Sequence, residues 1–127
     1  MTHDLAYRVG SLQKPHLPFT RIAEIGVQGL ELVWNDDTSV SAVEAALQGS
    51  GLRITSINPS CPLDDDNLAQ NLGRHAEYAA ALGATYLFVS AKAGDMPREA
   101  AYDRLRRVGD AVGEHQVYLA METHPDA

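Results

Sequence analysis

The sequence predicts an α/β fold, namely a partial (β/α)₈ barrel with strands 1–5 and four intervening helices. Short apolar segments alternate with amphipathic ones in units of roughly 25 to 33 residues, as the strand–helix crossovers of a parallel sheet require. The sequence contains neither GxGxxG nor GxxxxGK[ST], the two nucleotide-binding patterns of open parallel sheets. This absence favours a barrel, and an open doubly wound sheet remains the competing architecture.

Five strands are expected, and each is a short apolar or β-branched run. The segment 52–60 is rich in β-branched residues between Gly51 and Pro59, and 85–91 is nearly all apolar, which is typical of a strand buried on both faces. The expected strands, in chain order, are 4–11, 29–35, 52–60, 85–91 and 117–123.

Four helices separate the strands, and each has apolar residues at the spacing of one helical face. A capping box of Ser41 and Glu44 is expected at the start of the second helix. The expected helices are 19–28 with Phe19, Ile22, Ala23 and Ile25 on one face, 40–48, 68–84 with Leu68, Leu72, Ala79 and Leu82, and 97–116 with Ala101, Leu105, Val108 and Val112.

Length and composition limit the function classes. The 127 residues are expected to belong to a single domain, 1–127, with enough apolar residues for a core. A net charge of −7 argues against a broad nucleic-acid or anionic-membrane surface, and no apolar run is long enough to span a membrane. The amino terminus does not resemble a secretory signal, so a cytoplasmic location is expected. Cys61 is the only cysteine, which excludes an intrachain disulfide.

The candidate chemistry lies where strands end, because catalytic groups of parallel α/β folds gather there. Glu122 is the strongest candidate. Strand alternation places it on the predicted inner face, opposite to the face of Leu119 and Met121. A carboxylate at this position can bind a hard divalent cation or take a proton from a carbon next to a carbonyl. His124 follows on the same face if the strand continues.

Other polar residues have structural interpretations. Glu31 interrupts an apolar strand, which favours a structural role, in a buried ion pair with Arg8 or Lys92, over a catalytic role. The carboxylates Asp64 to Asp66 precede a helix, so capping is expected rather than calcium binding. His75 is expected to be packed and hydrogen-bonded rather than a ligand, and the lone Cys61 to be inert.

The segments "IGVQGLELVW", "GLRITSIN", "AAALGATYLFV" and "VYLAMETHPD" together resemble the first five strands of the xylose-isomerase-like TIM barrels. This family includes sugar (phosphate) isomerases and epimerases. The resemblance implies a divalent metal, Mn²⁺, Mg²⁺ or Co²⁺, with Glu122 as the fifth-strand ligand and as the residue that shuttles the proton. It implies a sugar or polyol substrate that contacts Trp34, and Lys92 and His124 are further expected contacts. The histidines that endonuclease members bring from strands three and four have no counterpart here, which disfavours DNA as substrate.

The resemblance also implies that strands 6–8 are absent from this chain, since a full barrel needs about 250 residues. The expected function is therefore that of a fragment, the amino-terminal portion of a metal-dependent sugar or polyol isomerase or epimerase, which alone would be inactive. Two alternatives stay open. One is a non-catalytic half-barrel that assembles with itself, as a homo-oligomer, or with another chain. The other is an open α/β domain that binds a small ligand, and strand order would discriminate between these folds.

Overall fold

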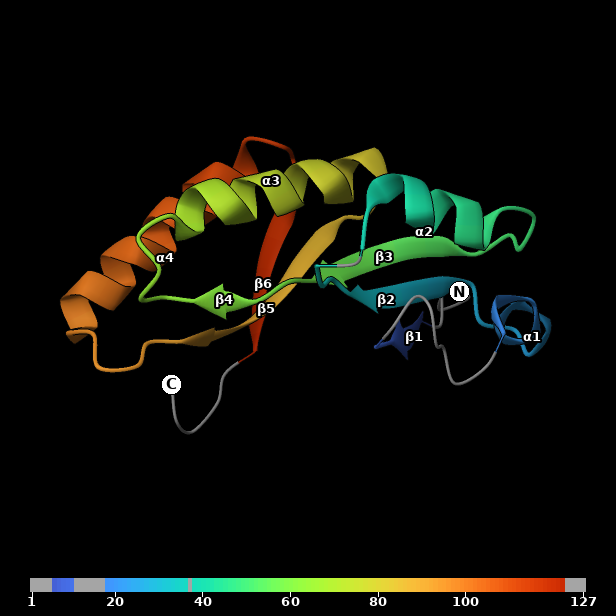
Figure 1. Ribbon diagram of the computed structural model, residues 1–127, viewed down its shortest axis with the longest axis horizontal. Coiled ribbons are helices and arrows are strands. Elements are labelled where there is room, and N and C mark those ends of the chain that lie inside the picture. Colours follow the sequence, from blue (N-terminus) through green and yellow to red (C-terminus); the bar gives the residue numbers. More distant parts are fainter. Residues whose placement is uncertain (1–5, 11–17, 37, 123–127) are drawn as a thin grey trace, which may run out of the picture.

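The structure is a computed structural model that describes residues 6–10, 18–36 and 38–122, and Figure 1 shows its alternating strands and helices. The strands are β1 Ala6–Val9, β2 Gly29–Val33, β3 Arg53–Asn58, β4 Cys61–Pro62, β5 Tyr86–Lys92 and β6 Tyr118–Glu122. The helices are α1 Phe19–Glu24, α2 Val40–Leu47, α3 Leu68–Ala81 and α4 Arg98–Gly113.

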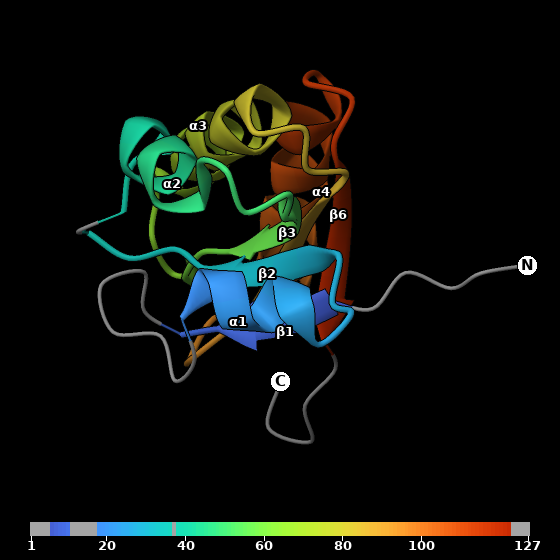
Figure 2. The same ribbon diagram turned by 90° about the vertical axis from the view of Figure 1, so that its right-hand side faces the viewer.

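The strands form one parallel sheet in which the main strands follow one another in chain order. β1 pairs with β2, β2 with β3, β3 with β5, and β5 with β6, and every pairing is parallel. A doubly wound sheet would reverse its strand order partway, and no reversal occurs in the described part of the chain. The fold is therefore a partial (β/α) barrel, as the sequence predicts. The direction of β6 is inclined strongly to that of β2 in both Figure 1 and Figure 2, so the sheet is strongly twisted.

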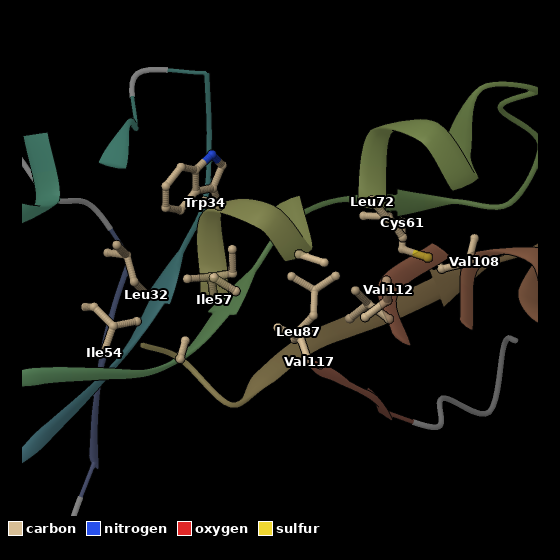
Figure 3. Close-up of a cluster of buried hydrophobic side chains, with 14 of the residues drawn as sticks. Leu32, Trp34, Ile54, Ile57, Cys61, Leu72, Leu87, Val108, Val112 and Val117 are labelled. Atoms are coloured by element: carbon tan, nitrogen blue, oxygen red, sulfur yellow. The ribbon is translucent and has the colours of Figure 1, made fainter. Parts of the chain in front are cut away.

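The core lies between the sheet and the helices α2, α3 and α4, which cover one face (Figure 1). Alternate strand residues point into it. Leu30 and Leu32 of β2 and Leu87 and Val89 of β5 are fully buried, whereas Glu31 between the two leucines and Phe88 between Leu87 and Val89 are only half-buried. Figure 3 shows this layer continuing into α3 and α4 through residues such as Leu72, Val108 and Val112. The other face of the strands is the inner face of the partial barrel.

Three local predictions were wrong. The first helix ends at Glu24, and the side chain of Ile25 is exposed rather than sharing the buried face of Ile22. The second helix is capped by Ser39, whose hydroxyl accepts a hydrogen bond from the backbone N–H of Ala42 at 3.2 Å, so the predicted capping box does not form. The third is an additional short strand, β4, in a segment expected to be a loop.

β4 extends the sheet beyond the end of β3. Cys61 pairs with Ala91 and Pro62 with Lys92, while β3 pairs with β5 only at Ser56 and Ile57. The loop after β3 thus takes over the pairing of the carboxyl-terminal half of β5. Arg104 of α4 connects this loop to the helix, since its guanidinium donates hydrogen bonds to the backbone carbonyls of Leu63 and Asp65.

Candidate active site

Glu122 lies on the inner face at the carboxyl end of β6, where the sequence predicts it. It pairs in register with Ser90 of β5, and register partners in a parallel sheet share a face. The hydroxyl Oγ of Ser90 donates a hydrogen bond of 2.9 Å to Oε2 of Glu122. The side chain of Glu122 is exposed and that of Ser90 is half-buried. The carboxylate therefore reaches solvent while one of its oxygens is held by the neighbouring strand.

A cavity of about 340 Å³ opens beside this pair. Its walls are formed by Ser60, Cys61 and Pro62 from the loop after β3 and by Ser90 and Lys92 from β5. Lys92 is exposed and lies two residues beyond Ser90, hence on the same face of the strand. Two serines and a lysine thus line one small space, and the carboxylate of Glu122 is bonded to one of these serines, an arrangement that suits a small-molecule ligand.

A second group of polar contacts lies on the inner face towards β1. Nη1 of Arg8 forms an ion pair with Oε1 of Glu31 at 2.5 Å, and Nη2 of Arg8 donates to Oδ1 of Asn58 at 3.0 Å. The side-chain amide of Asn58 in turn donates to the backbone carbonyl of Phe88. Of the two cations named as possible partners of Glu31, Arg8 is the one that the structure places there. The side chains of Arg8 and Glu31 are 53% and 29% exposed, so the ion pair is only partly buried.

Trp34 lies away from Glu122. It continues the buried row of Leu30 and Leu32, its side chain is 7% exposed, and its ring contacts those of His75 and Tyr78 on α3. Trp34 therefore belongs to the helix-covered side of the sheet, and Figure 3 shows its indole pointing to that side. The ring also lines an open cavity of about 970 Å³ between α2 and α3. The role of Trp34 as a substrate contact stays a prediction, and its packing against α3 lends that role no support.

Burial sets the protonation of two groups outside the Glu122 pair. It lowers the pKa of His75, and the neighbouring charge of Arg74 lowers it further, while the hydrogen bond to the carbonyl of Asn71 acts in the opposite direction. Since a carbonyl only accepts, Nδ1 of His75 carries the proton in this 2.7 Å bond. Burial raises the pKa of Cys61 to about 11. Both residues are therefore uncharged near neutral pH, in line with the structural roles that the sequence predicts.

The donor chemistry of Glu122 suits a hard divalent cation, because carboxylate oxygens are the ligands such ions prefer. Within residues 6–10, 18–36 and 38–122, however, no three side chains of His, Cys, Asp or Glu are arranged to hold a metal ion. The described residues thus supply one ligand of the predicted kind and not a complete site. His124 lies outside the described residues.

Two functional contacts escaped the sequence analysis. The bond from Ser90 to Glu122 could have been found by aligning "TYLFVSA" with "VYLAMET", because the register pairs Tyr86 with Tyr118 and so sets Ser90 against Glu122. The hydrogen bonds from Arg104 to the loop after β3 had no such signal in the sequence, since their acceptors are backbone carbonyls some forty residues away in the chain.

Parallel strands that pair in chain order and alternate with helices are the arrangement of (β/α) barrels. A family model described as "Xylose isomerase-like TIM barrel" matches residues 19–127. The chain belongs to this xylose isomerase-like family. A search among curated proteins found no matching sequence.

Solved structures agree on the fold. An AP endonuclease of family 2 from Brucella melitensis matches with a TM-score of 0.66 and 18% identity over 95% of this chain and 55% of its own. An IOLI protein with a bound zinc atom matches with a TM-score of 0.69 and 17% sequence identity, and the match covers 98% of this chain and 54% of the IOLI protein. A sugar phosphate isomerase/epimerase from Parabacteroides distasonis matches with a TM-score of 0.66 and 12% sequence identity, and the match covers 97% of this chain and 52% of that protein. The chain spans about half the length of these proteins.

Proposed function

We propose that these residues are the amino-terminal half of a barrel enzyme, a divalent-metal-dependent isomerase or epimerase of a sugar or polyol, located in the cytoplasm. The observation that carries the proposal is the inner-face carboxylate of Glu122 at the carboxyl end of β6, bonded to Ser90, which lines a small cavity. The family membership supports it, as does the zinc atom in one structural neighbour. None of the helices in the described part of the chain has the length and apolar character of a membrane span.

In this proposal Glu122 is the catalytic base. Its carboxylate takes the proton from the carbon next to the substrate carbonyl, the C–H bonding pair forms the C=C bond of an enediolate, and the carbonyl π pair moves onto its oxygen. In isomerisation Glu122 returns the proton to the neighbouring carbon, and a proton moves from one oxygen to the other. In epimerisation Glu122 keeps the proton, and an acid on the opposite face of the same carbon, proposed to lie outside this chain, delivers another. A bound Mn²⁺, Mg²⁺ or Co²⁺ would supply polarisation of the carbonyl. Glu122 would be one of its ligands, and the remaining ligands are proposed to lie outside this chain.

Lys92 is proposed to contact the substrate from the wall of the cavity, and His124 from beyond the strand. We do not propose a nucleic-acid substrate, although one structural neighbour is named as an AP endonuclease. The chain carries a net charge of −7, which repels polyphosphate. The ends of β3 and β5 read "INPSC" and "VSAKAG", with no histidine to bind a metal there.

The test is solvent exchange at carbon. The complete gene product would be incubated with a panel of ketoses and polyol-derived ketones in D₂O with Mn²⁺, and deuterium in the substrate followed by NMR. Incorporation is expected for the wild type and is expected to fall by at least about 100-fold in Glu122→Gln, because general acid–base catalysis contributes about 10²–10⁴-fold. Glu77→Gln on the exposed side of α3 is the matched control. Exchange that survives Glu122→Gln would refute the role of Glu122.

A second candidate function has one observation in its favour. Tyr86 and Tyr118 are exposed side by side at the amino-terminal ends of β5 and β6, with ring centroids 5.9 Å apart. Such an uncovered pair suits a half-barrel that assembles with itself or with another chain. Sedimentation of residues 1–127 alone would test it. A monomer at high micromolar concentration would count against self-assembly.

A further inference from the structure

Ser90 is the residue next to Glu122 whose placement the sheet itself determines. The two residues are direct register partners on neighbouring parallel strands, which lie about 4.8 Å apart. At this separation a serine hydroxyl reaches the carboxylate of a glutamate only when the glutamate leans across the sheet. The 2.9 Å bond from Oγ of Ser90 to Oε2 of Glu122 therefore records one particular direction of the longer side chain.

An ionised carboxylate only accepts hydrogen bonds, so Ser90 is the donor. Because the carboxylate is planar, holding Oε2 against β5 also sets the direction of Oε1. Glutamate has three side-chain torsions and is exposed at this position, so a hydrogen bond to its carboxylate restricts the rotamers that it samples. The hydroxyl thus contributes directly to the geometry of the carboxylate.

Ser90 is itself firmly placed, because β5 is anchored on both sides of it. Two residues before it, the carbonyl of Phe88 accepts a hydrogen bond from the amide of Asn58. Two residues after it, the carbonyl of Lys92 accepts from the backbone N–H of Leu63 at 2.9 Å. The loop that carries Leu63 is in turn gripped by Arg104. The strand segment that presents the hydroxyl is therefore tied to β3, to the loop after it and, through that loop, to α4.

We propose that Ser90 is a positioning residue that orients the carboxylate of Glu122 for proton transfer and for holding a divalent cation. This inference rests on the proposed function of Glu122. Partners that orient a ligating carboxylate change metal affinity or activity by about 10–100-fold when they are lost. Removal of the Ser90 hydroxyl should accordingly impair Glu122 without removing any group that touches the substrate carbon.

The experiment compares Ser90→Ala, Ser90→Thr and Ser56→Ala in the complete gene product. Ser56 lies on the same face of the sheet, in register with Tyr86, so its replacement is the same chemical change away from the Glu122 pair. For each protein, kcat and KM of the exchange reaction, the Kd for Mn²⁺ by calorimetry, the melting temperature and the crystal structure would be determined.

Ser90→Ala is expected to lower kcat by about 10–100-fold with little change in KM, and to weaken Mn²⁺ binding by about 10–100-fold. The carboxylate of Glu122 should leave its position in the crystal structure. Ser90→Thr keeps a hydroxyl on a residue that strands favour, and should recover most of both quantities. Ser56→Ala should match the wild type, and all three variants should melt close to it.

Two results would overturn the inference. One is Ser90→Ala with the kinetics, Mn²⁺ affinity and Glu122 orientation of the wild type. The other is a loss of activity in Ser90→Ala that Ser90→Thr does not recover, since that would make the contribution of Ser90 one of shape rather than of the hydroxyl. Failure of the proposed function is a separate outcome. If Glu122→Gln retains exchange, the orientation of Glu122 in the Ser90→Ala crystal structure still decides whether Ser90 positions it.

Discussion

The ring of Trp34 stacks on the ring of Tyr78, with centroids 5.3 Å apart and planes inclined by 17°. This contact joins the residue after β2 to the last turn of α3, and the ring of His75 meets that of Trp34 edge-on, with centroids 6.3 Å apart. Stacked aromatic pairs contribute about 0.5–1.5 kcal/mol beyond the burial of their area. The cluster is therefore one of the fixed points between the sheet and its helical cover.

Replacement of Tyr78 by leucine removes the stack and keeps an apolar side chain. We expect Tyr78→Leu to lower the free energy of unfolding by at least about 0.5–1.5 kcal/mol, measured by urea denaturation. Tyr102→Leu is the control, because Tyr102 is 57% exposed on α4 and should tolerate the change. Equal stability of the two variants would contradict the role of the stack.

Trp34 is the only tryptophan of these 127 residues, so its fluorescence reports on one place in this part of the molecule. We expect blue-shifted emission that changes little when a sugar binds beside Glu122, because the indole lies on the other face of the sheet. The difference in emission between the complete gene product and its Trp34→Phe variant, followed during titration with substrate, checks this. A substantial change in emission on binding would favour the substrate contact that the sequence resemblance implies for Trp34.

The lowered pKa of His75 makes stability depend on pH. The unfolded chain takes up a proton at this residue near pH 6.5, whereas the folded chain resists protonation until a lower pH, so the unfolded state binds more protons in between. The contribution of His75 is fully present above pH 6.5 and declines as the pH falls below it. Unfolding free energies of the wild type and His75→Gln between pH 7.5 and 5 should therefore converge or cross on acidification. A parallel pair of pH profiles would contradict this expectation.

The thiol of Cys61 should be unreactive in the folded protein. At pH 8 a pKa of about 11 in place of 9.0 lowers the thiolate fraction by about 100-fold, and only the thiolate is nucleophilic. Alkylation by iodoacetamide should therefore be at least about 100-fold slower in the native protein than in urea. Labelling at the rate of the unfolded chain would show that the loop after β3 opens readily.

The ion pair of Arg8 and Glu31 should contribute little to stability, since both side chains are partly exposed. A double-mutant cycle with Arg8→Met and Glu31→Gln is expected to give a coupling energy below about 1 kcal/mol. Thermal or urea unfolding of the four proteins provides the measurement. A coupling of several kcal/mol would mean that the pair is more deeply desolvated than its exposure indicates.

Gly29 is required by contact with the neighbouring strand. A Cβ at this position would lie 2.5 Å from Cγ2 of Thr55, a β-branched side chain with little freedom to move. We expect Gly29→Ala to destabilise the protein by about 1–3 kcal/mol, as overpacking does. Adding Thr55→Ser removes the clashing methyl group and keeps the hydroxyl that donates to the carbonyl of Leu30, so the double variant should recover most of the loss. No recovery would contradict the steric explanation.

The sequence predicts the fold well because its signals are local. Alternation along β2 shows that Leu30 and Leu32 share a face, and the spacing in α3 does the same for Leu68 and Leu72, both without reference to the rest of the chain. The exposure of Ile25 depends on the residue at which the first helix ends, and the cap at Ser39 depends on the residue at which the second helix begins. Several neighbouring residues could occupy either boundary position. β4 is not predictable from "CP", because a two-residue strand exists only through the carbonyls and amides that β5 leaves available.

For the candidate site, the position of Glu122 follows from parity along a single strand. Its partner Ser90 follows only from the register between two strands, which depends on packing along their whole length. The packing of Trp34 against α3 follows from the parity of its own strand, whereas its role as a substrate contact comes from the resemblance and stays a prediction.

Because every main strand pairs with the strand made just before it, assembly can keep pace with translation. When β2 leaves the ribosome, β1 has already been made and can pair with it. Each later main strand can likewise pair with the strand at the open edge of the sheet. Each described main strand after β1 finds its partner already made, while the outer edge of β1 and the edge of the newest strand both stay open to chaperones and to other nascent chains. The carboxylate of Glu122 joins this sequence last among the described residues, on a platform that is already assembled when it arrives.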